Sequence, residues 1–125
     1  MYQLEKMSEN CFYLKTIGKF PPVEAKRFVN DFKEQTKRLK KFRFLVDISD
    51  ANLLDGNSIN IILDLLKENN KRLEKSAFVI TDNPPLDVEF QYLLEKAASP
   101  KRKIVTTLDE AKKWLGINDI VIKKD

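Results

Sequence analysis

Short apolar runs alternate along this chain with longer segments of helical periodicity. Runs typical of strands occupy residues 2–6, 11–17, 42–48, 77–80 and 103–105. In the segments 22–39, 56–72, 84–97 and 108–115, apolar residues recur every three or four positions. The alternation predicts an α/β fold in which a mixed sheet packs against about four helices. The polar turn at residues 8–10 should join the first two strands as an antiparallel pair.

The second and fourth helices have the sharpest boundary signals. The second is expected to run from Gly56 to about residue 72, with an inward face made of Ile62, Leu65, Leu66 and Leu73. The fourth has a capping box at residues 107–110, and Gly116 is suited to end it in a left-handed conformation. Trp114 falls on the apolar side of this helix, where we expect it to anchor the core rather than to stack on a ligand.

The composition limits the number of domains and the kinds of active site that this chain can have. With 125 residues, inside the range of roughly 100–200 for one domain, the chain should form a single domain over residues 1–125, with 117–125 as a flexible tail or an added edge strand. The absence of histidine excludes an imidazole base and a His-ligated metal. The single cysteine, Cys11, cannot form an intramolecular disulfide, and its apolar surroundings indicate a structural role.

The charge is positive but evenly balanced. A net charge of +4 comes from 23 basic and 19 acidic residues. The basic residues cluster between positions 33 and 43, where cations complement the negative end of the first helix, and no aromatic ladder accompanies them. We therefore expect no nucleic acid partner. No run approaches the roughly 20 apolar residues of a membrane span, and no secretory signal is present, so a cytoplasmic protein is predicted.

The segment 44–63, FLVDISDANLLDGNSINIIL, is the strongest candidate for a functional site. It joins a buried strand to an apolar-faced helix through a short loop rich in acids and amides. Asp47, close to the end of the strand, should accept a hydrogen bond from a backbone donor or water and so structure the base of the loop. Asp55, Asn57 or Ser58 can cap the helix that follows.

This segment resembles the signature of STAS domains, the family of anti-sigma-factor antagonists related to SpoIIAA. Their pattern is an apolar strand, D-L/I-S, several residues, then D-S/T-S/T-G and an apolar helix. Asp47-Ile48-Ser49 matches the first half and Asp55 the acid of the second, and the final T-x-x-E-A-x-x-W-L helix is also similar. The resemblance implies a SpoIIAA-like fold and a non-enzymatic signalling module that binds a protein partner, such as an anti-sigma-type kinase.

One departure from the family pattern changes the expected regulation. In the phosphorylated members a Ser or Thr directly after the loop Asp, or one residue later, accepts phosphate, whereas this chain has Gly56 and Asn57 there. Ser58, at the family's glycine position, should make a helix N-terminal hydrogen bond, and it is the candidate phosphosite of the loop. The predicted partner-binding residues are Ser49, Asp55, Gly56, Asn57, Ser58 and Asn60.

Two other functions compete with partner binding. Asp47 and Asp55 suggest a catalytic carboxylate pair, but no nucleophile with a base, glycine-rich phosphate loop or metal-ligand cluster accompanies them, so we predict no enzyme and no cofactor. The alternative is a small apolar, lipid-like ligand in a cavity. Aromatic residues that could line one are Phe28, Phe32, Phe78, Phe90, Tyr92 and Trp114. A domain of this size also needs such side chains to fill its core.

Overall fold

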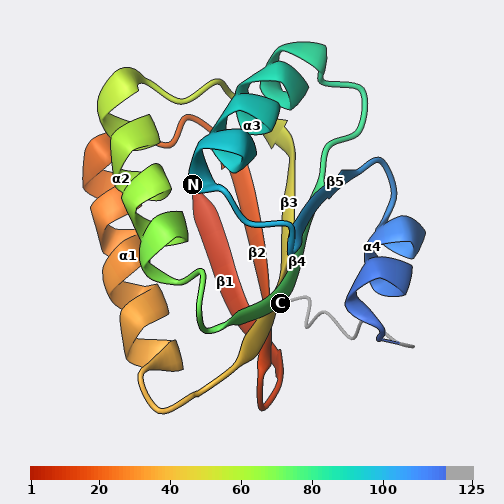
Figure 1. The fold of residues 1–125 in the computed structure, drawn as a ribbon. Helices are drawn as coiled ribbons and strands as arrows, with labels where there is room; N and C mark the ends of the chain where they lie inside the picture. The colour runs from red at the N-terminus through yellow and green to blue at the C-terminus, as the bar shows by residue number, and fades with distance from the viewer. Residues whose placement is uncertain (118–125) are drawn as a thin grey trace.

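The computed structural model of the protein describes residues 1–117. In chain order its elements are β1 (Tyr2–Ser8), β2 (Cys11–Gly18), α1 (Pro22–Thr36), β3 (Phe42–Ala51), α2 (Gly56–Glu68), β4 (Leu73–Val79), α3 (Pro84–Ala97), β5 (Arg102–Val105) and α4 (Leu108–Leu115) (Figure 1). The predicted tail or edge strand lies almost wholly at residues 118–125, outside the described residues.

The five strands of the described residues form one mixed sheet in the order β1-β2-β3-β4-β5. β1 pairs with β2 in antiparallel fashion, and the other three pairings are parallel. Because successive crossovers advance across the sheet in one direction with one handedness, their helices lie on the same face. Accordingly α1, α2 and α3 cover one face and α4 the other (Figure 1). The predicted α/β fold class, a mixed sheet with about four helices, is confirmed.

The hydrophobic core is divided by the sheet into a large and a small part. Along β3, Phe42, Phe44, Val46 and Ile48 face α1–α3, while Leu45 faces α4. The large part contains all eight phenylalanine side chains. Five of them contact one another at ring-centroid distances of 5.4 to 6.5 Å: Phe12, Phe28, Phe32, Phe42 and Phe44. Of the aromatics proposed to line a ligand cavity, two lie outside this large core: Tyr92 is 52% exposed, and Trp114 packs against the small core.

The junction of α2 and β4 differs from the prediction. α2 ends at Glu68 rather than near residue 72, and β4 begins at Leu73 rather than at residue 77. Asn69 ends the helix, since its side-chain amide donates to the carbonyl of Leu65 and its backbone amide to that of Leu66. Leu73 therefore belongs to the sheet, where it pairs with Phe42 and is buried in the same core. Leu73 and the inward side chains of α2 are buried in the same core. The position of Leu73 in the sequence therefore also fits a continuation of the helix.

Helix α4 follows the sequence prediction closely. Thr107 caps it by accepting a hydrogen bond from the backbone amide of Glu110, and Gly116 ends it at φ 70°. Trp114 fixes the helix to the sheet by donating its indole N–H to the carbonyl oxygen of Ser76 at 2.9 Å. Its ring is only half-buried, and the ammonium groups of Lys75 and Lys103 lie against it at 4.3 and 5.4 Å from a ring centroid.

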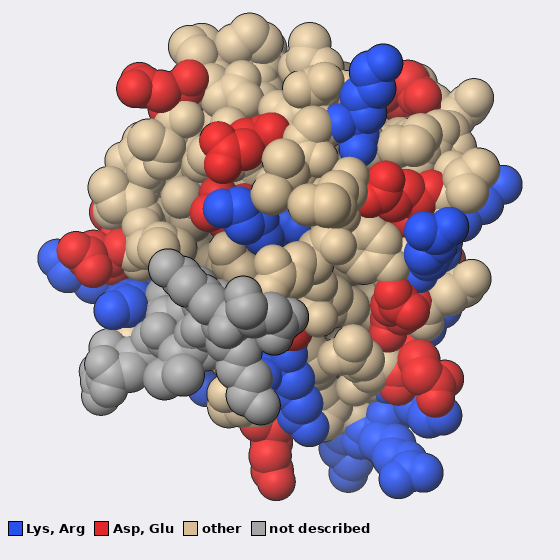
Figure 2. Space-filling view, turned by 180° about the vertical axis from the view of Figure 1, so that it is seen from behind, with Lys and Arg blue, Asp and Glu red and all other residues tan. Residues whose placement is uncertain are grey.

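The basic residues near positions 33–43 are largely engaged in local contacts. Lys37 pairs with Glu34 at 2.6 Å, and Lys33 lies 3.9 Å from Glu68 of α2. Lys41 donates to the carbonyl oxygen of Lys71. On the side of the molecule seen in Figure 2, basic and acidic side chains are interspersed rather than separated into areas of one sign. Among residues 1–117 no helix has the length and apolar character required to cross a membrane.

Candidate functional site

The candidate site lies where β3 passes through residues 52–55 into α2, along the upper edge of the molecule in Figure 1. This is the edge at which the parallel strands end, which is where ligands and partners bind in open α/β sheets. The connection contains two leucines: Leu53 is 55% exposed, whereas Leu54 packs against the large core. The site therefore combines an anchored backbone with an exposed outer surface.

Asp47 makes a local hydrogen bond at a bulge in β3. In the pairing with β2, Lys15 opposes Asp47 and Ile17 opposes Asp50, so β3 has one extra residue and forms a bulge there. The carboxylate of Asp47 accepts a hydrogen bond from the amide of Ser49 inside this bulge, at 3.2 Å. Burial raises the pKa of the neighbouring Tyr13 to about 12, and the negative charge of Asp47 adds to this shift. Its role here is local and structural.

Ser49 ties β3 to the connection between β4 and α3. Its hydroxyl donates to the carbonyl of Val79 at 3.3 Å and accepts from the amide of Thr81 at 2.9 Å. The side-chain amide of Asn83 donates to the carbonyls of Ser49 and Ala51. Thr81 and Asn83 were missed by the sequence reasoning, although Asn83 before two prolines was an available signal of a turn. These bonds give the edge of the site a fixed shape.

Residues at the start of α2 cap the helix and line its exposed surface. Asp55 is the N-cap, and its carboxylate accepts from the backbone amide of Ser58 at 2.9 Å. Gly56 opens the helix with an ordinary negative φ, and a Cβ atom there would meet nothing within 4 Å. Asn57 and Asn60 are exposed. Three residues apart on a helix, they lie on neighbouring positions of one face.

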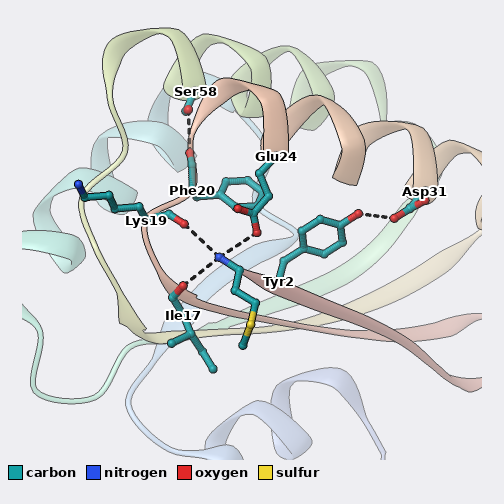
Figure 3. A network of polar contacts seen from close by, with 8 residues as sticks. Tyr2, Ile17, Lys19, Phe20, Glu24, Asp31 and Ser58 are labelled. Carbon is teal, nitrogen blue, oxygen red and sulfur yellow. Dashed lines mark hydrogen bonds and ion pairs between the residues drawn. The ribbon is translucent and has the colours of Figure 1, made fainter.

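Ser58 has a different environment from its neighbours. It is wholly buried, and its hydroxyl donates to the carbonyl oxygen of Phe20 at 2.8 Å, in the segment that leads into α1 (Figure 3). The predicted helix N-terminal hydrogen bonding is present, since its amide is the one that Asp55 caps. A partner or a kinase cannot reach this hydroxyl while the first turn of α2 is in place. The arrangement thus gives no support to Ser58 as a contact or phosphosite.

The same end of the molecule is held together by contacts close to Phe20. The Met1 nitrogen donates to the carbonyls of Ile17 and Lys19 and lies 2.8 Å from a carboxylate oxygen of Glu24 (Figure 3). These bonds connect β1, the end of β2 and α1. The segment that accepts the Ser58 hydrogen bond is therefore itself fixed, and α2 begins on a firm support.

A third contact fastens the connection between β3 and α2 from the side of α3. The carboxylate of Glu89 accepts a hydrogen bond from the backbone amide of Leu54 at 3.0 Å. Burial raises the pKa of Glu89, while this hydrogen bond opposes the shift. Sequence reasoning missed Glu89, because it lies 35 positions from Leu54 and stands on a helix whose pattern indicates only an outward polar residue.

The arrangement does not bring together a catalytic pair. Asp47 lies two residues after Leu45 along β3 and so shares its face, which α4 covers, whereas Asp55 caps α2 on the opposite face. In residues 1–117 no three His, Cys, Asp or Glu side chains are grouped so that they could hold a metal ion. Cys11 is buried and burial raises its pKa, which fits a structural thiol. What the site offers is a shaped surface of amides and backbone.

Comparison with solved structures identifies the fold. The chain superposes on an uncharacterised protein of the DUF3478 family from Shewanella loihica PV-4, described as having a SpoIIAA-like fold, with a TM-score of 0.71 and 16% identity over 92% of each chain. It superposes on the unphosphorylated form of the anti-sigma factor antagonist SpoIIAA with a TM-score of 0.65 and 11% identity, over 95% of this chain and all of the other. The chain has a SpoIIAA-like fold.

In both comparisons the match covers more than nine tenths of this chain and of the solved structure. No protein-family model and no curated protein sequence matches this chain. At these identities the likeness concerns the fold, and the residues of the site have to be judged by their own geometry.

Proposed function

We propose that this protein is a non-enzymatic regulatory domain of the STAS type, a cytoplasmic signalling module that binds a protein partner at the start of α2. We call the binding area the α2 surface and define it as Ser49, Leu53, Asp55, Gly56, Asn57 and Asn60. SpoIIAA, which has the same fold, is an anti-sigma factor antagonist, so a protein partner is the natural expectation. The exposure of Asn57 and Asn60 beside a firmly capped helix start carries the proposal.

The α2 surface has the properties of a small protein interface. Leu53 supplies an exposed apolar side chain, and the amides of Asn57 and Asn60 can donate and accept hydrogen bonds around it. The bonds from Ser58 to Phe20 and from Leu54 to Glu89 hold the backbone in place. Because the free protein already has this shape, binding should lose little ordering entropy at the surface.

Regulation in this proposal does not use phosphate on the loop. The positions that accept phosphate in the resembling family are Gly56 and Asn57, and the nearest hydroxyl, that of Ser58, is buried and engaged. A phosphate on Ser58 would need the first turn of α2 to open. We therefore propose that the amount of partner, rather than phosphorylation of the loop, sets how much complex forms.

Capture of the partner from the native host tests this proposal. Tagged wild-type protein, the double variant Asn57→Asp/Asn60→Arg and the control Lys113→Glu would be compared by quantitative mass spectrometry of bound proteins. Lys113 is an exposed residue of α4, on the opposite face of the sheet. A charge placed at the centre of an interface must be desolvated or repelled, commonly at a cost of about 2–5 kcal/mol. The double variant should lose the partner, and the control should keep it.

Calorimetry with the captured partner then measures affinity, and melting temperatures show whether each variant is folded. Equal affinity of wild type and folded double variant would place the partner surface elsewhere. The next surface to examine would then be the basic cluster between positions 33 and 43.

A further inference from the structure

The large core contains an apolar cavity of about 90 Å³ between the sheet and helices α1–α3. Four of the six aromatic residues that the sequence offered as the lining of a ligand cavity do line this one: Phe28, Phe32, Phe78 and Phe90. These side chains therefore leave a space rather than filling the core completely. The cavity reaches Asn52 and Leu54, so one part of it lies behind the connection that leads into α2.

Two polar residues on neighbouring strands also line this cavity. Ser76 of β4 and Arg102 of β5 are paired directly across the parallel strands. Ser76 is 3% exposed, and within the described residues its buried hydroxyl has no hydrogen-bond partner. A buried hydroxyl without a hydrogen-bond partner destabilises the fold, so such groups are uncommon in folded proteins.

Arg102 is a buried cation on the strand next to Ser76. It is 8% exposed, and among residues 1–117 no carboxylate forms an ion pair with it. Its guanidinium donates to the side-chain oxygen of Asn70 at 2.5 Å and to the carbonyl of Leu66, in the last turn of α2, at 2.7 Å. These neutral oxygens and the negative end of the helix stabilise the cation, but they do not neutralise it.

Burial lowers the pKa of Arg102 to about 10, so the group still carries its charge at neutral pH. A guanidinium has five N–H donors, and two of its hydrogen bonds are accounted for. The surface of the cavity is thus almost wholly apolar, and two residues paired on adjacent strands, Ser76 and Arg102, bring a hydroxyl and a positive charge to its lining. A carboxylate attached to a small hydrocarbon group matches both properties.

We propose that this cavity binds a small apolar carboxylate, with the hydrocarbon part between the phenylalanine side chains and the carboxylate accepting hydrogen bonds from Ser76 and Arg102. The size of the cavity limits the ligand. An apolar cavity of roughly 150 Å³ holds benzene, so the smaller space here suits a short aliphatic chain, or an aromatic ring with slight adjustment of the walls. This site is separate from the α2 surface and does not depend on partner binding.

Isovalerate and benzoate are suitable probes, with isoamyl alcohol as the neutral comparison of isovalerate. Titration calorimetry and melting temperatures of the purified protein should show saturable binding and stabilisation by at least one of the two carboxylates. The alcohol should bind about tenfold more weakly than isovalerate, because it brings no charge to Arg102.

The variant Ser76→Ala separates a binding role from a structural one. Since the hydroxyl has no hydrogen-bond partner within residues 1–117, its removal should leave the melting temperature unchanged or raise it. Carboxylate affinity should nevertheless fall about tenfold, the loss expected for one hydrogen bond to a charged group. Ser8→Ala, at the exposed end of β1, is the matched control and should change neither quantity.

A second variant, Arg102→Lys, keeps the positive charge but removes the planar guanidinium group, which can donate two parallel hydrogen bonds to a carboxylate. This variant should also weaken carboxylate binding. Three results would each overturn the proposal: neither carboxylate binds the wild type, Ser76→Ala binds as tightly as the wild type, or the alcohol binds as tightly as isovalerate. None of these results bears on the α2 surface, whose test uses different variants.

Discussion

The hydroxyl of Ser58 and the carbonyl oxygen of Phe20 form a buried hydrogen bond of 2.8 Å between the first turn of α2 and the segment entering α1. Removing the hydroxyl leaves a carbonyl without its partner in a site closed to water. We expect Ser58→Ala to lower the free energy of unfolding by about 1–3 kcal/mol. Urea denaturation measures this, and Asn57→Ser on the exposed side of the same turn should stay within about 0.5 kcal/mol of wild type.

Phosphate should be absent from residues 49–60 in protein isolated from its host. The usual acceptor positions are Gly56 and Asn57, and Ser58 is buried. Intact mass and phosphopeptide analysis provide the measurement. Stoichiometric phosphate on Ser58 would contradict the prediction and restore a switch with a displaced acceptor. Phosphate on Ser49 would show that its bonds to Val79 and Thr81 open in the cell.

Gly56 offers a position where a side chain should stabilise the protein. Its φ is negative, and the space beside its Cα is open, because a Cβ atom there would contact nothing within 4 Å. Gly56→Ala should therefore raise the free energy of unfolding by about 0.4–1 kcal/mol, through a less flexible unfolded chain. Gly18→Ala is the contrasting control: φ there is 67°, so alanine should destabilise. Thermal unfolding of both variants compares the two effects.

Leu65 tests the inward face of α2. It is 6% exposed and lines the core cavity, so Leu65→Ala should enlarge that space and cost about 2–5 kcal/mol. Leu53→Ala is a matched control, since Leu53 is 55% exposed and its truncation should change stability by no more than about 0.5 kcal/mol. Similar unfolding free energies for the two variants would mean that the Leu65 side chain is not buried between α2 and the sheet.

Glu89 should make stability depend on pH in a defined direction. Burial raises its pKa in the folded protein, so the folded state holds this proton more strongly than the unfolded chain. Stability from this group is therefore present at low pH and is lost as pH rises through the folded pKa. Glu89→Gln retains an acceptor for the Leu54 amide without the charge.

The melting temperature of Glu89→Gln, relative to wild type, should accordingly increase between about pH 4 and pH 7. The change should be small, because Glu89 is only half-buried and solvent screens its charge. A variant that loses stability relative to wild type over this range would show that the ionised carboxylate stabilises the connection before α2.

The sequence by itself determined the features that depend on neighbouring residues. The short apolar run of Phe44, Leu45, Val46 and Ile48 predicted an interior strand, and the Thr107 cap and Gly116 bounded α4 at the residues observed. Local hydrogen bonds and backbone conformation produce these signals. The motif residues Asp47-Ile48-Ser49 and Asp55 carried the resemblance to STAS domains, which implied the SpoIIAA-like fold.

Only the tertiary structure decided where non-local partners lie. Leu73 has an apolar spacing that fits a helix or a strand, and its pairing with Phe42 places it in the sheet. Ser58 resembles a surface residue at a helix start until the fold brings the Phe20 carbonyl, 38 positions away, within 2.8 Å. Likewise Ser76 and Arg102 meet because β4 and β5 are parallel neighbours. Contacts between distant segments depend on the packing of the whole sheet, which no local pattern encodes.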